Sequence, residues 1–211
     1  MSQVALPIFP LPDLAFFPRT MLPLHIFEAR YRAMVTDCLA RDKRLAVVGL
    51  RPGYEATYEG KPPVYGVTGV GRIVRWERLP TGRYNLLLRG EVRARIDREL
   101  PADTLYRMVA ATPLEETGAE GPAVEAAASQ VRARCQQIFT ALGRSAAELQ
   151  KTLDALSDPA ELADQVASAL VPVHATRQAL LEELHVERRL ERLVGALDDL
   201  LSRLPGDGGR A

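Results

Sequence analysis

The sequence has few of the residues that build metal and catalytic sites: only three of its 211 residues are histidine and two are cysteine. His25, His174 and His185 form no HExxH pair, and with the cysteines they show no zinc-ligand spacing. Cys38 and Cys135 lie far apart in two predicted helices, which is not the pattern of a disulfide-rich secreted protein. We therefore predict two reduced thiols, a cytoplasmic location, and no metal or cofactor.

Long apolar runs and an excess of one charge are also missing. No stretch of about 18 apolar residues is present, so no membrane-spanning helix is predicted. The apolar N-terminus carries Asp13 and several prolines but no basic segment, which is atypical of a signal peptide. Lys+Arg and Asp+Glu both total 27 and give a formal net charge of +0. This balance provides no electrostatic attraction to a membrane or to nucleic acid, so we expect neither as the main partner.

Stretches that superficially resemble catalytic motifs fail on spacing. In residues 53–62 six residues separate the two glycines and proline follows Lys61, whereas a Walker motif has four residues there and a Ser or Thr after the lysine. The three glycines of residues 66–74 lead into a strand, which favours a close backbone approach or a β-bulge over a dinucleotide site. Ser145 and Lys151 are six positions apart on a predicted helix and therefore face different ways. We predict that the chain is not an enzyme.

The type of periodicity changes once along the chain, near residues 115–123. Short strands dominate before this point and helices after it, which indicates an α+β fold. We predict a β-rich lobe over residues 1–116, a helical bundle over 123–204 and a flexible tail over 205–211. Several short strands with tight connections favour a closed or nearly closed barrel with one helix. The strands are expected at 6–11, 22–27, 45–50, 71–79, 83–90, 91–100 and 105–112, and the helix at 28–40.

The helical half is expected to end in a long helix from Thr176 to Leu204, after helices at 123–142, 145–156 and 158–171. Leucines recur along this last helix at steps of three and four, which is a heptad pattern. Two interpretations stay open, namely a packing stripe within one chain, or a helix that pairs with a second copy in a homodimer. The residues expected to self-associate in the second case are Leu190, Leu193, Leu197 and Leu200.

An exposed apolar surface is predicted near the N-terminus. Phe16 and Phe17 are adjacent, so both cannot face inward if their segment is extended. Leu22 and Tyr54 would add apolar area, and the four residues together form the predicted polypeptide-binding surface. The alternative is that both phenylalanines are covered by the helical lobe.

Two other functions stay open as alternatives. Eight arginines fall within residues 72–98, close to Trp76 and Tyr84, which would suit RNA binding through Arg93 and Arg95. An ordinary solvated sheet face explains the same pattern. The second alternative is an adaptor that senses a small molecule in a pocket between the two lobes.

Three blocks of the sequence, in the same order, resemble the N-terminal domain of Lon-type ATP-dependent proteases. They are LPIFPLPDLAFFPRTMLPLHIFEARYRAMV, GVTGVGRIVRWERLPTGRYNLLLRGEVRARI, and DPAELADQVASAL followed by RQALLEELHVERRLERLVGAL. The resemblance implies a PUA-like pseudobarrel followed by a helical bundle. It also implies recognition of unfolded or tagged polypeptides, in company with a protease or chaperone. Because the chain ends at Ala211, where the ATPase and protease domains of that family begin, we expect a stand-alone, non-catalytic form.

Overall fold

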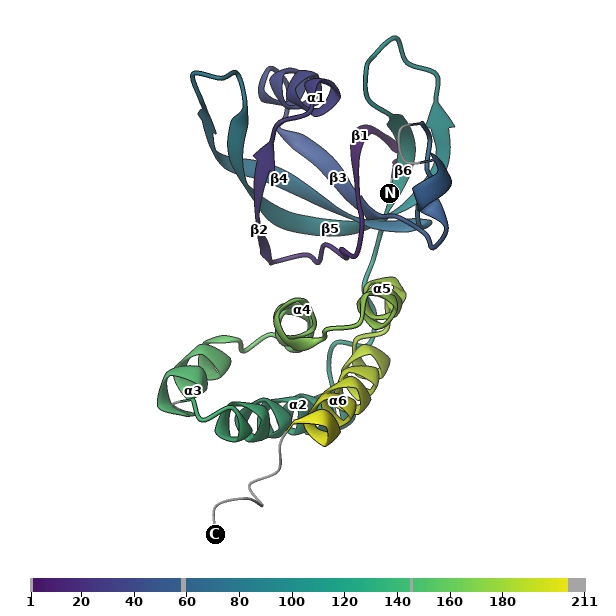
Figure 1. Cartoon of the computed structure of the whole chain (residues 1–211). Helices are drawn as coiled ribbons and strands as arrows, with labels where there is room; N and C mark the ends of the chain where they lie inside the picture. The colour runs from purple at the N-terminus through teal and green to yellow at the C-terminus, as the bar shows by residue number, and fades with distance from the viewer. Residues whose placement is uncertain (1, 58–59, 145, 205–211) are drawn as a thin grey trace. The chain divides into compact units, whose positions relative to one another are not determined.

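The computed structural model in Figure 1 describes residues 2–57, 60–144 and 146–204, without the side chains of 146–150. The chain divides between Glu115 and Glu116 into two units, each with its own internal packing. This division falls one residue before the predicted end of the first lobe. The predicted flexible tail, 205–211, lies outside the described residues.

The first unit is built on one six-stranded sheet with the order β2-β5-β4-β3-β1-β6. An additional pairing of β5 with β6 closes five of these strands into a barrel, as the short strands predicted. Only β1 and β3 run parallel to each other. The strands are β1 Val4–Leu11, β2 Met21–Ile26, β3 Arg44–Gly49, β4 Val67–Arg78, β5 Tyr84–Leu100 and β6 Met108–Leu114, and two helical segments accompany them, α1 Ala29–Leu39 and the 3-10 turn η1 Tyr54–Thr57.

Strand β5 differs from the prediction because it is one strand of 17 residues, whereas the pattern indicated two. Its register against β4 shifts beside Gly90, so a β-bulge joins the two alternating segments. Its first part pairs with β2 and its second part with β6. This length allows one strand to belong both to the barrel and to the three-stranded β2–β5–β4 face.

Helix α1 packs against one core of the first unit. Its buried side chains recur at three- and four-residue steps, as the sequence predicted for this segment. They share a cluster with side chains from β1, β3, β4 and β5, and a smaller cluster of aliphatic side chains fills the barrel around Ile8 and Val109. The α1 residues in the first cluster are Tyr31, Met34, Val35 and Cys38.

The second unit contains five helices within the described residues: α2 Pro122–Ala141, α3 Ala146–Ala155, α4 Pro159–Leu170, α5 His174–Glu182 and α6 Val186–Arg203. The predicted start of α4 is confirmed, because Asp158 accepts a 2.8 Å hydrogen bond from the Ala160 amide. Helix α6 packs along α2 and also contacts α4 (Figure 1). None of the described helices is long and apolar enough to cross a bilayer.

The prediction of a single last helix is wrong, because the chain is extended at residues 183–185 between α5 and α6. No glycine or proline breaks the helix there. Instead Thr117 forms a parallel β-bridge with His185. Its amide donates to the Leu184 carbonyl, and its carbonyl accepts from the Val186 amide. Gly118 allows this approach, because a Cβ atom there would lie 2.4 Å from the His185 ring. Pairing with a distant segment thus replaces local helical hydrogen bonds.

Candidate functional site

The loop that carries Phe16 and Phe17 lies directly on the sheet. A Cβ atom on Gly69 would lie 1.9 Å from the Phe16 carbonyl oxygen, and one on Gly90 would lie 2.1 Å from the Phe17 carbonyl oxygen. Because these positions are glycine, the loop backbone touches the backbone of β4 and β5. The close backbone approach predicted for residues 66–74 is therefore confirmed at Gly69.

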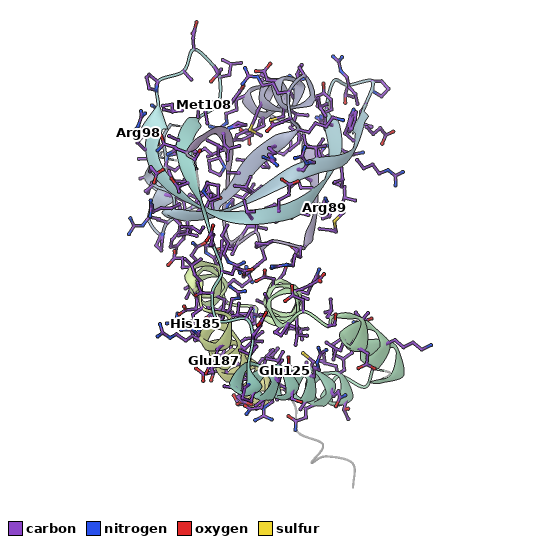
Figure 2. The ribbon with its side chains drawn as sticks, turned by 180° about the vertical axis from the view of Figure 1, so that it is seen from behind. Arg89, Arg98, Met108, Glu125, His185 and Glu187 are labelled. Carbon is purple, nitrogen blue, oxygen red and sulfur yellow. The ribbon has the colours of Figure 1, made fainter. Side chains whose placement is uncertain are left out.

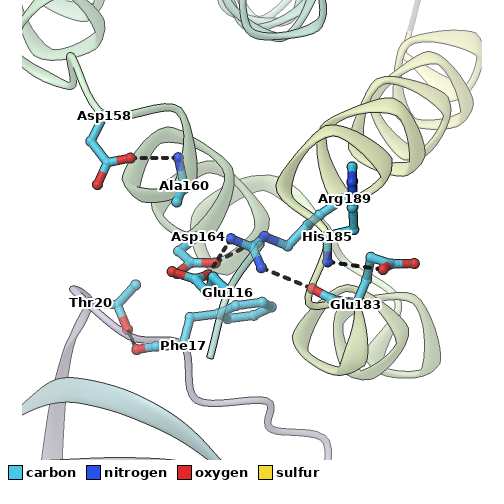
Figure 3. Close-up of polar contacts among 9 residues, drawn as sticks. All are labelled: Phe17, Thr20, Glu116, Asp158, Ala160, Asp164, Glu183, His185 and Arg189. Carbon is cyan, nitrogen blue, oxygen red and sulfur yellow. Dashed lines mark hydrogen bonds and ion pairs between the residues drawn. The ribbon is translucent and has the colours of Figure 1, made fainter. Parts of the chain in front are cut away.

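Phe16 and Phe17 do not form the exposed surface that we expected. Their exposed fractions are 3% and 0%, and Phe16 belongs to the core beneath α1. The prediction assumed an extended segment, but residues 12–20 contain no strand, and the Thr20 hydroxyl closes a turn by donating to the Phe17 carbonyl at 2.7 Å (Figure 3). A turning backbone can direct two neighbouring side chains inward, whereas a strand cannot.

Leu22 and Tyr54 are both half-buried. Leu22 faces the core side of β2 together with Leu24, and Tyr54 lies in η1. The structure therefore does not bring the four residues predicted for polypeptide binding into one exposed surface. Residues 58–59 of the loop beyond η1 lie outside the described residues.

An exposed apolar surface does exist, on the opposite face of β2. Strand β2 alternates, with Leu22, Leu24 and Ile26 toward the core and the odd-numbered residues outward. The outward apolar side chains of β2 and the chain just after it are joined by others from β5 and β4. We call this surface the outer patch, and it consists of Met21, Pro23, Phe27, Val74 and Leu87.

The registers of three strands determine how the outer patch is arranged. Met21 lies opposite Arg89, and Pro23 lies opposite Leu87. A register shift in β4 places both Val74 and Arg75 beside Leu87. The apolar side chains therefore cross β2, β5 and β4 on the outer side of the sheet.

The outer patch is largely open to solvent. Met21 is 50% exposed, Phe27 59% and Val74 41%. Phe27 stacks near His25, with ring centroids 6.4 Å apart, and His25 Nδ1 donates to Asn85 Oδ1 at 2.8 Å. These contacts support the Phe27 ring, and exposed apolar side chains gathered on one sheet face make this surface a candidate for binding.

The edge of β2 next to the patch is blunted by Pro23. Within the described residues β2 pairs with β5 alone. The Gly90 amide donates to the Thr20 carbonyl, so even-numbered residues of β2 direct their backbone groups toward β5 and Pro23 faces the free edge. Proline has no N–H to offer there, so regular strand addition is disfavoured and the side chains are left as the main means of contact.

The outer patch was missed because both faces of the MLPLHIF segment are apolar. A strand with leucines on one face and Met, Pro and Phe on the other shows no polar alternation, so the sequence does not say which face is exposed. We chose Leu22, which is one residue away from the outward row. Helix α1 packs on the core side of the sheet and leaves Met21 and Phe27 exposed on the other side. The periodicity of the sequence does not indicate which side a helix covers.

The arginines of the RNA-binding alternative are not presented as an open basic surface. Arg93 is 1% exposed, with its guanidinium 5.9 Å from the Phe17 ring centroid. Arg95 forms a 3.0 Å ion pair with Asp97. Arg93 is thus buried, and the charge of Arg95 is balanced by that of Asp97.

Three of the four leucines predicted for self-association through α6 are buried within the second unit. Leu190, Leu193 and Leu197 are each 0% exposed, because α6 packs its heptad stripe against α2 and α4. Leu200 is half-buried. This burial supports the interpretation of a packing stripe within one chain.

A buried charge cluster joins the start of α6 to the rest of the second unit (Figure 3). The Arg189 guanidinium donates to the Glu183 carbonyl at 2.9 Å and to the Glu116 carboxylate, and it lies 3.5 Å from Asp164. Arg189 and Asp164 are both 0% exposed. Since the Arg189 guanidinium has these partners within the second unit, we assign the cluster a structural role at the α5–α6 break.

Neither cysteine has the character of a nucleophile. Burial raises the pKa of the Cys38 thiol to about 12, with further contributions from Asp42 and Asp37. Burial also raises the pKa of Cys135 to about 11. Both thiols therefore stay protonated at neutral pH. Ser145 lies outside the described residues, and Lys151, the other residue of the Ser-Lys pair considered from the sequence, is exposed on α3.

Metal-binding side chains and cavities are the remaining candidate features of a functional site. No group of three or more His, Cys, Asp or Glu side chains that could hold a metal occurs among the described residues. A cavity of about 480 Å³ lies between α2, α3 and α4, and its walls are apolar apart from Thr152 and Gln165. Such a cavity offers no charged group that would orient a substrate.

Comparisons with known proteins agree with one another. The model of the ATP-dependent protease La (LON) substrate-binding domain matches residues 5–199. Lon protease 1 of Syntrophobacter fumaroxidans is 29% identical over 196 residues, which are 93% of this chain and 24% of that protein. Lon protease 3 of Sorangium cellulosum is 29% identical over 190 residues, which are 89% of this chain and 22% of that protein. The chain thus spans about a quarter of the length of these relatives.

Two solved structures show the same fold. The N-terminal domain of Mycobacterium avium complex Lon protease superimposes with a TM-score of 0.75 at 20% identity, covering 93% of this chain and 99% of that one. The Lon N-terminal domain protein from Xanthomonas campestris gives 0.65 at 24% identity, with 96% and 99% covered. With the family match over nearly all of the chain, the resemblance noted from the sequence is confirmed. The chain belongs to the family of the ATP-dependent protease La (LON) substrate-binding domain.

Proposed function

We propose that this chain is a non-catalytic module that binds unfolded or partly unfolded polypeptides through the outer patch. The observation that carries the proposal is the exposure of Met21, Phe27 and Val74 together on one rigid sheet face. Burying such side chains against an apolar segment of a client is favourable by about 25 cal/mol per Å² of apolar area. An apolar sheet face beside a strand edge that carries proline can contact segments of many different sequences.

The partner implied by this role is an ATP-dependent protease, since the relatives of the chain are named Lon proteases. The module would hold a client, and the protease would unfold and cut it. The family model and the protonated cysteines support a binding role rather than a catalytic one. The chain matches 24% of the length of Lon protease 1, which agrees with one module that binds clients and a separate part that cuts them.

The proposal can be tested by measuring the affinity of the full chain for a permanently unfolded client, such as a reduced and carboxymethylated protein. The double variant Met21→Ser/Phe27→Ser should bind at least about tenfold more weakly, because an exposed apolar side chain contributes roughly 1 kcal/mol or more when it is buried on binding. Leu105→Ser is the matched control, because Leu105 is 70% exposed but lies in the loop between β5 and β6. Equal loss in the control and the double variant, or no loss in either, would contradict the proposal.

A further inference from the structure

The surroundings of the outer patch carry an uneven charge. Arg75 on β4 and Arg89 on β5 are exposed, and their side chains form no ion pair or hydrogen bond with the described residues. Arg72 differs, because its Nε is bound to Glu91 at 2.7 Å. The guanidinium groups of Arg75 and Arg89 beside the patch are therefore available to a ligand. Figure 2 shows Arg89 on β5.

These two arginines lie in register with the apolar residues. Arg89 faces Met21 across the β2–β5 ladder, and Arg75 faces Leu87 across the β5–β4 ladder. Residues two apart on a strand project on the same side about 7 Å apart. An extended peptide lying along the strands with an apolar side chain over Pro23 and Leu87 would therefore place its residue two positions away near Arg89.

The opposite end of the face has the opposite character. Glu77 on β4 accepts a 3.4 Å hydrogen bond from Asn85, which in turn accepts one from His25. Asn85 faces both His25 and Glu77 in the ladders. The outer face thus carries Glu77 at one end and Arg89 at the other, and Pro23, Leu87 and Arg75 lie in the row between them.

We propose that the outer face selects apolar segments that carry an acidic residue two positions from the apolar anchor, and disfavours segments with a basic residue there. This inference rests on the proposed function, since it assigns a charge preference to the same surface. The apolar anchor supplies most of the affinity, the carboxylate pairs with Arg89 at the rim, and Arg75 adds positive charge beside the anchor. Arginine suits this task because its planar guanidinium can hold a carboxylate through two hydrogen bonds.

The test uses the full chain and three labelled peptides with a phenylalanine anchor. The residue two positions after the anchor is glutamate in the first peptide, glutamine in the second and lysine in the third. A matched set carries the same residue two positions before the anchor, so that either chain direction is covered. Fluorescence anisotropy at low salt should show the glutamate peptide binding about 3- to 10-fold more tightly than the glutamine peptide, and the lysine peptide most weakly. The preference should fade at high salt.

Two variants assign the effect to the two arginines. Arg75→Gln/Arg89→Gln should abolish the preference and leave the glutamine peptide bound as before. Arg98→Gln is the matched control, because Arg98 is also exposed on β5 but lies opposite Ala110 of β6. The control should keep the full preference.

Each outcome decides between the two proposals. If the three peptides bind equally and Met21→Ser/Phe27→Ser weakens all of them, the charge preference is refuted and the apolar site stands. If no peptide binds, both fall together. If a single-stranded RNA oligomer displaces the glutamate peptide and depends on Arg75 and Arg89 more strongly than the peptide does, the assignment to an acidic peptide is overturned.

Discussion

Gly69 determines how closely the loop with Phe16 approaches β4. A Cβ atom at this position would lie 1.9 Å from a backbone oxygen, and backbone cannot move aside as the end of a side chain can. We expect Gly69→Ala to lower the free energy of unfolding by roughly 1–3 kcal/mol or more through overpacking. Urea denaturation measures this value.

The control for this change is three residues earlier. A Cβ atom on Gly66 would meet nothing within 4 Å, so Gly66→Ala should stay within about 0.5 kcal/mol of the original protein. If the two alanine variants unfold at the same urea concentration, the loop does not lie on the sheet as described. The sequence predicted a close backbone approach at the glycine-rich stretch, but it did not indicate that the loop with Phe16 is the segment that approaches.

The Asp97 carboxylate is expected to contribute to stability in a way that depends on pH. Hydrogen bonds from Thr112, Gln3 and Arg95 lower the pKa of its carboxyl group to about 2, from an ordinary value of 3.8. The folded state thus favours the ionised form, and this contribution to stability is present above about pH 4 and lost as the pH falls toward 2. Asp97→Asn should therefore be less stable than the original protein at pH 6, and the difference should shrink between pH 4 and 2.

Urea midpoints at pH 6, 4, 3 and 2 test this expectation. Asp103→Asn, in the exposed loop between β5 and β6, is the control and should follow the original protein at every pH. A constant difference between Asp97→Asn and the original protein across the range would show that the carboxylate does not act through its ionisation.

At the scale of whole elements, the break between α5 and α6 depends on Arg189. Its guanidinium holds the Glu183 carbonyl at the end of α5 and two carboxylates, one of them fully buried on α4. Arg189→Met should lower the free energy of unfolding by roughly 3–5 kcal/mol, because Asp164 would remain buried without its counter-charge.

Arg192 provides the comparison. It lies on the same helix and forms a 3.0 Å ion pair with Glu183, but its side chain is 56% exposed. Arg192→Met should cost less than about 1 kcal/mol, as expected of a surface ion pair. Chemical denaturation of both variants, followed by far-ultraviolet circular dichroism, tests the difference. Similar stability of the two variants would contradict the structural role of the buried cluster.

Some helices and strands are predictable from the local sequence, and others depend on distant parts of the chain. Helix α1 and the capped start of α4 follow from local periodicity and from Asp158, so they were predictable. The helix break at 183–185 was not, because its cause is Thr117, nearly 70 positions earlier in the chain. The same limit applies to β5, where pairing with three other strands joins two predicted segments into one.

At the scale of the whole molecule, the family and the α+β architecture were accessible from the sequence, because three blocks of core residues are spread along nearly the whole chain. The binding surface was not accessible. Phe16 and Phe17 are buried, whereas Met21 and Phe27 are exposed, and all four lie in similarly apolar sequence. Only the packing of the loop on its glycines and of α1 on the sheet distinguishes them.

The central claim is that the outer patch receives unfolded polypeptide, and the methionines provide a direct measurement of it. The chain has four methionines. Met21 belongs to the outer patch, Met34 is fully buried on the inner side of α1, and Met108 is half-buried on β6, where Figure 2 shows it. With carbon-13 in the methionine methyl groups, NMR spectra can be recorded while an unfolded client is added to the full chain. We predict that the Met21 signal shifts or broadens in proportion to binding while the Met34 and Met108 signals stay unchanged. An unchanged Met21 signal at saturating client, or a shift of Met108 instead, would contradict the account.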